Sequence, residues 1–344
     1  MRSGDDVLGP LTTAGLTQAG IPCRVHDLWP EWWADHLWHS KLPGRRTAFE
    51  YGPAALSLLG KARLCSESDV VWINGPASPL NKSCWFERRI IRSGNSYVFH
   101  LLDDWFSDEN FREIAAARVR IAAAVIVPTQ ALKDRILGLF PSARVIVLEE
   151  PIDIERIKPL PRPPVAGAPF IVWSGHFHSQ AELFRCLDIL EQLYAKHPFT
   201  LRIISRLTGP LPKFSFPVEW FPYDAKREAE WISGAAAAVA PLADTPYTRC
   251  KGGYKVKTYF AAGVPVVAAP IGHHPAMIRS GENGILATSP AEWLEALGML
   301  VSDRACAARM GDAARATAVS RYSHAALMPG WAEALQDAFP SLRR

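Results

Sequence analysis

The chain has 344 residues, of which 49% are hydrophobic, and a formal net charge of +4 at pH 7. This length exceeds what one compact core usually accommodates, so two domains of about 150 residues each are expected. The small positive charge is no footprint of a nucleic-acid-binding protein, so nucleic acid is an unlikely partner. No hydrophobic run approaches the about 20 residues of a membrane span, and the first residues do not read as a signal peptide. A cytoplasmic protein is therefore expected.

The six cysteines show no spacing that is typical of a metal site or a disulfide framework. They stand at positions 23, 65, 84, 186, 250 and 306, without a CxxC pair or a Cys/His ligand pattern. Structural zinc and paired disulfides are therefore not expected, and the thiols are predicted to be reduced.

Short β-branched runs alternate with helical segments in the first half of the chain. These runs cover residues 23–27, 69–74, 96–101, 124–128 and 144–148. The alternation is typical of a parallel sheet with helices on both faces. A helical pattern at 11–19 precedes all of these runs, so the usual opening strand is either missing or is a short polar strand at 1–7.

A second series of such runs predicts a second, similar domain. Its runs cover residues 170–175, 200–205, 218–221, 237–241, 264–269 and 284–287. Six prolines between Pro151 and Pro169 support neither a helix nor a central strand, so this stretch is predicted to be a linker. The predicted domains are thus 1–150 and 170–322, joined by 151–169. A last amphipathic segment with Leu327, Trp331, Leu335 and Phe339 falls in 323–344.

The run from Cys250 to Gly272 combines a glycine turn, three lysines, a helix start and an apolar strand. Gly252 and Gly253 permit a tight turn, and a helical pattern begins directly after them. The N–H groups and the positive dipole end of that helix favour a phosphate or a carboxylate, and Lys251 and Lys255 add full charges. The sequence therefore predicts an anion site, with an ordinary helix bearing solvated lysines as the alternative.

Several ordered motifs resemble glycosyltransferases of the family 4 type. They are IVWSG at 171–175, AVAPLAD at 238–244, CKGGYK at 250–255, YFAAGVPVV at 259–267, GENGILA at 281–287, EWLEAL at 292–297 and RYS at 321–323. In the first half the likeness rests on 100–104, 124–133 and 151–153.

The resemblance implies the GT-B fold, in which two doubly wound, Rossmann-like α/β domains face each other across a cleft. It implies that the first domain takes the acceptor and the second takes the nucleotide sugar. It also implies that the last helix crosses back to the first domain.

The resemblance further implies transfer of a sugar from a nucleotide-diphosphate sugar, with retention, to a glycan, glycolipid or small glycoside acceptor. No cofactor or metal beyond the donor is expected. The residues implied to bind the donor are Gly175, His176, Ser179, Lys251, Gly252, Gly253, Lys255 and Thr258. The family often places a basic phosphate contact after Gly175, where His176 or His178 is the substitute and a surface histidine is an equal alternative.

The chain departs from the family at two acidic positions. Similar proteins commonly have two glutamates with seven residues between them, the first touching sugar hydroxyls and the second the ribose. Cys250 and Thr258 hold those places here, beside a Lys-x-Gly-x-Lys arrangement that a subset of similar sequences shows. The resemblance therefore does not identify the residues that contact the sugar and the ribose, whereas the phosphate site is expected.

His100, Asp103 and Asp104 are the candidate catalytic residues. His100 stands where the family places a histidine that faces the transferred sugar, and a hydrogen-bonded structural histidine is the alternative. The two aspartates can orient an acceptor hydroxyl or cap the following helix.

Residues 28–38 hold four tryptophans, and the basic cluster 41–46 follows them. Tryptophan with arginine suits membrane headgroups, so peripheral membrane contact is one interpretation and a tryptophan-rich core is the other. Two alternative functions are a nucleotide-sugar isomerase or hydrolase and a non-catalytic binder of sugar nucleotides.

Overall fold

The computed structural model describes residues 10–23, 70–75, 83–160, 168–176, 179–206 and 213–343. The chain divides into two compact units, one made of Met1–Glu149 with Met328–Arg344 and the other of Glu150–Leu327. The strand predicted at 1–7 and the segments 28–38 and 41–46 lie outside the described residues, as does the strand predicted at 23–27 apart from Cys23.

The described part of the first unit is built on a parallel sheet in the order β1-β2-β3-β4. Its strands are β1 (Val70–Asn74), β2 (Ser96–His100), β3 (Ala124–Val127) and β4 (Val145–Val147). Its helices are α1 (Pro10–Gln18), α4 (Trp85–Arg92), η2 (Trp105–Ser107), α5 (Glu109–Val119), α6 (Gln130–Leu139), the end of α15 (His324–Ala338) and η5 (Pro340–Arg343). The four strands agree with the predicted ones to within one residue at each end.

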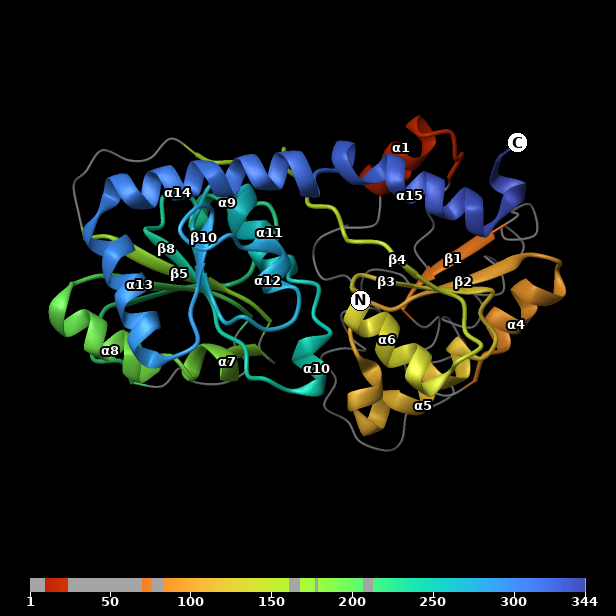
Figure 1. The fold of residues 1–344 in the computed structure, drawn as a ribbon, viewed down its shortest axis with the longest axis horizontal. Helices are drawn as coiled ribbons and strands as arrows, with labels where there is room; N and C mark the ends of the chain where they lie inside the picture. The colour runs from red at the N-terminus through yellow and green to blue at the C-terminus, as the bar shows by residue number, and fades with distance from the viewer. Residues whose placement is uncertain are drawn as a thin grey trace. The chain divides into compact units, whose positions relative to one another are not determined.

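Helices cover both faces of this sheet, as Figure 1 shows. On one face, Trp331 of α15 stacks on Trp72 of β1 with 5.6 Å between ring centroids. The Trp331 indole N–H also donates to the backbone oxygen of Glu149, at 3.1 Å. On the other side, Arg118 of α5 and Glu87 of α4 form a buried ion pair at 2.9 Å. The end of α15 is thus part of the core of the first unit.

The second unit has a six-stranded parallel sheet in the order β10-β9-β8-β5-β6-β7. Its strands are β5 (Phe170–Ser174), β6 (Thr200–Ile204), β7 (Val218–Phe221), β8 (Ala237–Ala240), β9 (Val266–Ala268) and β10 (Gly284–Leu286). Counted from β5, this is the order 3-2-1-4-5-6 of the Rossmann fold, which reverses direction between β5 and β8. The prediction of doubly wound α/β domains is confirmed.

Two layers of helices cover the second sheet. They comprise α7 (Gln180–Phe184), α8 (Leu187–Lys196), α9 (Glu228–Ile232), α10 (Pro246–Arg249), α11 (Tyr254–Ala261), α12 (His274–Met277), α13 (Pro290–Ser302), α14 (Arg304–Thr317) and a π-helical turn, η4 (Ala318–Tyr322). Residues of α8 and α13 pack in one apolar cluster, and residues of α9, α11 and α14 pack in the other.

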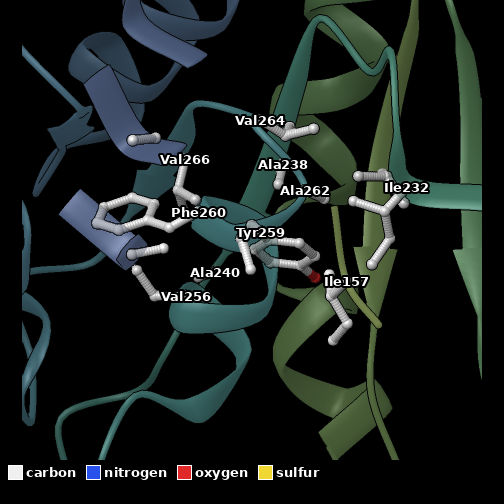
Figure 2. Close-up of a cluster of buried hydrophobic side chains, with 14 of the residues drawn as sticks. Ile157, Ile232, Ala238, Ala240, Val256, Tyr259, Phe260, Ala262, Val264 and Val266 are labelled. Atoms are coloured by element: carbon white, nitrogen blue, oxygen red, sulfur yellow. The ribbon is translucent and has the colours of Figure 1, made fainter. Parts of the chain in front are cut away.

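Helix α11 is anchored by its apolar face (Figure 2). Val256, Tyr259 and Phe260 are fully buried and pack with Ala238 and other small residues of the strands. Burial of three such side chains contributes about 1.5–3 kcal/mol each, as an upper value. The position of the first turn of α11 is therefore fixed by the core beneath it.

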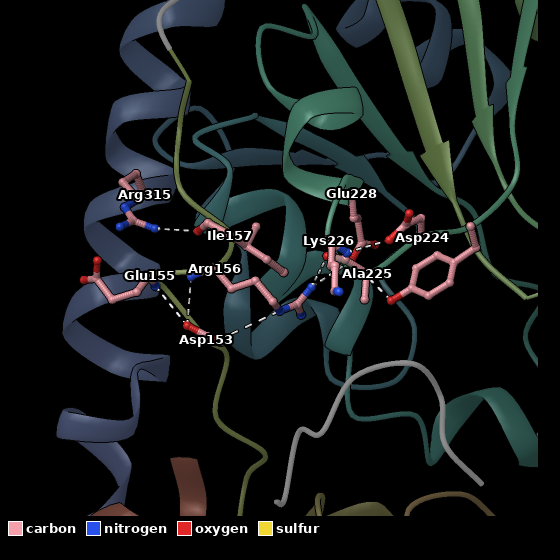
Figure 3. A network of polar contacts seen from close by, with 10 residues as sticks. Asp153, Glu155, Arg156, Ile157, Asp224, Ala225, Lys226, Glu228 and Arg315 are labelled. Atoms are coloured by element: carbon pink, nitrogen blue, oxygen red, sulfur yellow. Dashed lines mark hydrogen bonds and ion pairs between the residues drawn. The ribbon is translucent and has the colours of Figure 1, made fainter. Parts of the chain in front are cut away.

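The described start of the proline-rich stretch is held firmly against the second unit, although a linker was predicted at 151–169. Ile152 and Ile157 are fully buried. Arg315 of α14 donates to the backbone oxygens of Ile154 and Ile157, at 3.0 and 2.9 Å, and Figure 3 shows the bond to Ile157. Arg156 donates to the backbone oxygen of Ala225 at 2.7 Å. Residues 152–157 thus behave as an integral strap of the second unit.

Replacing Trp331 by alanine tests the role of the last helix. Loss of the stack on Trp72 and of the bond to Glu149 should destabilise the first unit by about 3–5 kcal/mol. Chemical unfolding followed by circular dichroism measures this loss. The control is Trp85→Ala, because Trp85 is 37% exposed. Equal stability of the two variants would contradict the packing role of Trp331.

Candidate functional site

The reversal of strand order in the second unit brings two loops to the carboxyl edge of the sheet. One loop follows β5 at Gly175, and the other follows β8 and leads through α10 to Gly253. Open α/β sheets bind ligands at such an edge. Gly253 caps α11 with a φ of +70°, in the left-handed region that favours glycine. The predicted helix start at the glycines is confirmed.

Three predicted donor-site residues converge at Gly175. A Cβ atom built on Gly175 would lie 2.8 Å from the Lys255 ammonium, 2.8 Å from the Ser179 hydroxyl and 2.6 Å from Trp173. The Ser179 hydroxyl also donates to the backbone oxygen of His176, at 2.8 Å. The absence of a side chain at Gly175 thus lets the Lys255 ammonium, the Ser179 hydroxyl and the Trp173 indole approach its backbone closely. His176 is exposed, and His178 lies outside the described residues.

The Lys255 ammonium sits in a weakly hydrated environment. It lies 4.4 Å from the centroid of the Trp173 indole, a cation–π geometry. Desolvation and the neighbouring Lys251 lower the pKa of Lys255 to about 7, while Glu182 acts in the opposite direction. A bound anion would favour the charged form and raise that pKa again.

Lys251 lies at the rim of the turn, whereas the third lysine is structural. The Lys251 ammonium is 4.5 Å from the Tyr247 ring centroid. Lys257 is buried, donates to the backbone oxygen of Glu150 at 2.8 Å and lies over the Tyr322 ring. Of the three lysines, Lys251 and Lys255 therefore remain as candidates for contact with an anion.

The two positions that usually hold glutamates are buried. Cys250 is 4% exposed, and the Thr258 hydroxyl donates to the backbone oxygen of Tyr254 at 3.2 Å. This bond within α11 gives Thr258 a local structural role, so its predicted contact with the donor stays a prediction. Gly252 is half-buried in the turn.

Sequence reasoning missed Glu182, which links the two loops. Its carboxylate accepts a hydrogen bond from the backbone N–H of Ala243 at 2.7 Å and contributes to the electrostatics of Lys255. Its position on α7, three residues after Ser179, was the available signal.

His100 lies at the carboxyl end of β2 in the first unit. The side chain is fully buried, and neither ring nitrogen has a hydrogen-bond partner among the described residues. Trp72 meets the imidazole edge to face at 5.2 Å. Burial lowers the pKa of His100 to about 3, so the ring is neutral near pH 7. A buried imidazole without partners is costly unless another group completes its hydrogen bonds.

The Asp104 carboxylate is occupied by protein contacts. It accepts bonds from the backbone N–H of Phe106 at 3.0 Å and the hydroxyl of Ser107 at 2.5 Å, and it pairs with Arg135 at 3.5 Å. These are the contacts of a helix cap, the alternative considered for this residue. Asp103 is half-buried and precedes the cap.

The described part of the chain has neither a cluster of metal ligands nor a membrane-spanning helix. No group of three or more His, Cys, Asp or Glu side chains there could hold a metal ion. No helix there is long and apolar enough to span a bilayer.

Part of the chain is similar to a known protein family. Residues 168–303 match the family described as "Glycosyl transferases group 1". A comparison with curated protein sequences gives no match. Residues 168–303 of the second unit are therefore similar to a group 1 glycosyltransferase domain.

Solved structures show the same fold at low sequence identity. HepE from Anabaena, in complex with UDP and glucose, is 19% identical with a TM-score of 0.60, and 83% of each chain is covered. Sucrose-phosphate synthase from Thermosynechococcus elongatus is 14% identical with a TM-score of 0.63, covering 86% of this chain and 81% of its own. A glycosyltransferase from Rickettsia africae is 12% identical with a TM-score of 0.62, covering 95% and 94%. The fold is GT-B.

Replacing Lys251 or Lys255 by alanine should lower nucleotide affinity about ten- to a hundredfold. Each change removes a charge-assisted contact of roughly 1.5–3 kcal/mol. Calorimetric titration with UDP measures the effect, and Lys196→Ala, an exposed lysine at the end of α8, is the control. Unchanged affinity in both variants would remove the anion site from this turn.

The lowered pKa of Lys255 predicts that binding depends on pH. Below a pH of about 7 the free protein carries the charged ammonium, so a diphosphate binds without proton uptake. Above it the neutral amine must take up a proton, and affinity falls as the pH rises. Calorimetry with UDP-glucose at pH 6 and pH 8.5, in buffers of different ionisation enthalpy, measures this uptake. Lys255→Ala should abolish the pH-linked part.

Proposed function

We propose that the chain transfers a sugar from a nucleotide-diphosphate sugar to a glycan, glycolipid or small glycoside acceptor, with retention at the anomeric carbon. The observation that carries this proposal is the convergence of Lys255, Ser179 and Gly175 beside the first turn of α11. The nucleotide-bound structures of HepE make UDP-glucose the first donor to test.

The chemistry explains the lysines. Transfer breaks the bond between the anomeric carbon and the phosphate oxygen and forms a bond from that carbon to an acceptor oxygen, whose proton is released. Negative charge then grows on the departing nucleoside diphosphate. The Lys255 ammonium, the Lys251 ammonium and the dipole of α11 stabilise that charge where it develops. No described contact of Lys255 is an ion pair with a carboxylate, so its charge is available for this role.

The proposal is tested by a thermal-shift screen followed by a transfer assay. Ligands that bind the folded chain raise its apparent stability, and the screen compares UDP-, GDP-, ADP-, CMP- and dTDP-sugars. NMR of the product then reports the anomeric configuration. Turnover without an acceptor would favour the alternative isomerase or hydrolase, and binding without turnover would favour the non-catalytic binder.

We also propose that His100 contacts the transferred sugar, because its buried ring nitrogens have no described protein partner. His100→Ala should lower kcat at least tenfold while the nucleotide affinity changes less than twofold. Steady-state kinetics and calorimetry with UDP measure the two quantities. A proportional loss of both would assign His100 a structural role. Asp103 and Asp104 are proposed to hold the loop beside it.

Peripheral contact with an anionic membrane surface is part of this proposal, and α4 supports it. Trp85 and Ile91 are 37% and 40% exposed, and Arg88, Arg89 and Arg92 are exposed around them. The one acidic residue of α4, Glu87, is buried against Arg118. A groove of about 400 Å³ adjoins this face, lined by Ser83, Cys84, Trp85, Arg88, Ala117, Arg120 and Ile121. Exposed aromatic and basic side chains suit headgroups.

Sedimentation with vesicles tests this contact. The chain should bind vesicles that contain phosphatidylglycerol and not pure phosphatidylcholine vesicles. Arg88→Glu with Arg92→Glu should weaken binding at least tenfold, since each basic residue contributes about 1 kcal/mol at such a surface. Lys196→Glu with Arg309→Glu makes the same charge change elsewhere. Equal losses in both double variants would indicate a general charge effect.

A further inference from the structure

His274 opens α12 at the same carboxyl edge as the anion site, after the loop that follows β9. Its Nδ1 lies 2.9 Å from the backbone oxygen of Ala269, and the side chain is 4% exposed. A carbonyl oxygen can only accept, so Nδ1 of the neutral ring carries the proton. Nε2 is therefore left with a lone pair, and no described residue donates to it.

The Cδ2 atom of the His274 ring lies beside the cap of α11. A Cβ atom on Gly253 would lie 3.6 Å from His274 Cδ2, the carbon bonded to Nε2. The loop is held to the turn because the backbone N–H of His273 donates to the backbone oxygen of Lys251 at 3.1 Å. Gly272, with a φ of +63°, permits this approach, since a Cβ there would meet the backbone oxygen of Thr248 at 2.7 Å.

The surroundings keep the His274 ring uncharged. Burial is the main cause that lowers its pKa to about 4, and the charges of Lys255, His273 and Lys251 act in the same direction. The bond to Ala269 opposes them. A neutral Nε2 is an acceptor, so it cannot hold a phosphate oxygen, which also only accepts. The group that it suits is a hydroxyl.

We propose that His274 Nε2 accepts a hydrogen bond from a hydroxyl of the transferred sugar. This inference rests on the proposed function, because it requires a donor diphosphate at Lys255 and the first turn of α11. His274 then supplies an acceptor in a turn where Cys250 and Thr258 provide no carboxylate.

The sugar is favoured over the ribose by the covalent structure of the donor. The 2-hydroxyl of the sugar stands on the carbon next to the anomeric carbon, which is bonded directly to the phosphate oxygen. The ribose hydroxyls are separated from their phosphate by a methylene and further ring carbons. An acceptor beside the phosphate site therefore meets the sugar 2-hydroxyl first.

The test compares His274→Phe, which keeps a ring of similar volume, with the unchanged chain. Calorimetry is run with UDP, UDP-glucose and UDP-2-deoxyglucose. The variant should bind UDP within twofold of the unchanged chain and UDP-glucose about three- to tenfold more weakly. The unchanged chain should bind UDP-2-deoxyglucose as weakly as the variant binds UDP-glucose. The variant should bind UDP-2-deoxyglucose no more weakly than the unchanged chain does, because a direct contact gives non-additive losses in a double-mutant cycle. The control is His197→Ala, because His197 is a half-buried histidine that directly follows α8.

Three outcomes would overturn the inference. Equal losses for UDP and UDP-glucose would assign His274 to the ribose or to the fold. Unchanged UDP-glucose affinity in the variant would remove the contact. If the affinity losses from His274→Phe and from removal of the 2-hydroxyl are additive, His274 does not contact the 2-hydroxyl. If the unchanged chain binds none of the three probes, the proposed UDP-sugar donor is the claim that fails.

Discussion

The candidate site depends on one electrostatic constraint, an ammonium held against an indole and another ammonium. Lys255 lies over Trp173 and close to Lys251, and both desolvation and like charge disfavour its protonated form. The folded chain tolerates this arrangement because α11 is fixed by Tyr259 and Phe260 in the core. A bound diphosphate would relieve the repulsion that the free site carries. The position of α11 therefore holds Lys255 where its charged form is disfavoured, and a bound anion would favour that form again.

The two units bring uncharged imidazoles to the carboxyl edges of their sheets by different means. His100 is neutral because it is buried, and its ring nitrogens have no hydrogen-bond partner among the described residues. His274 is neutral because it is buried beside cations, and its hydrogen bond to a carbonyl oxygen fixes the proton on Nδ1. In the first case either nitrogen can carry the proton, whereas in the second the tautomer is fixed. A fixed tautomer suits recognition, and a free one suits a group that changes partners along a reaction.

Much of the fold could be predicted from sequence because parallel strands are short apolar runs between helices. The strands of both sheets agree with their predicted ranges, and the start of α11 at Gly253 follows from the glycine pair. The local sequence pattern did not show which of the three lysines has a structural role. Lys251, Lys255 and Lys257 occur within seven positions, yet only Lys257 is turned to the core, where Glu150 and Tyr322 receive it. Its partners are distant in sequence, so no local pattern could reveal them.

The contacts of the proline-rich stretch likewise could not be predicted from local sequence. Its composition predicts neither helix nor central strand, and the described residues 151–160 form neither. Composition does not show that Ile152 and Ile157 are buried or that Arg315 binds the carbonyl oxygens of the strap. Arg315 also donates to the backbone oxygen of Ala261, at the end of α11. One guanidinium thus joins the strap to the end of α11, the helix whose first turn is the proposed anion site.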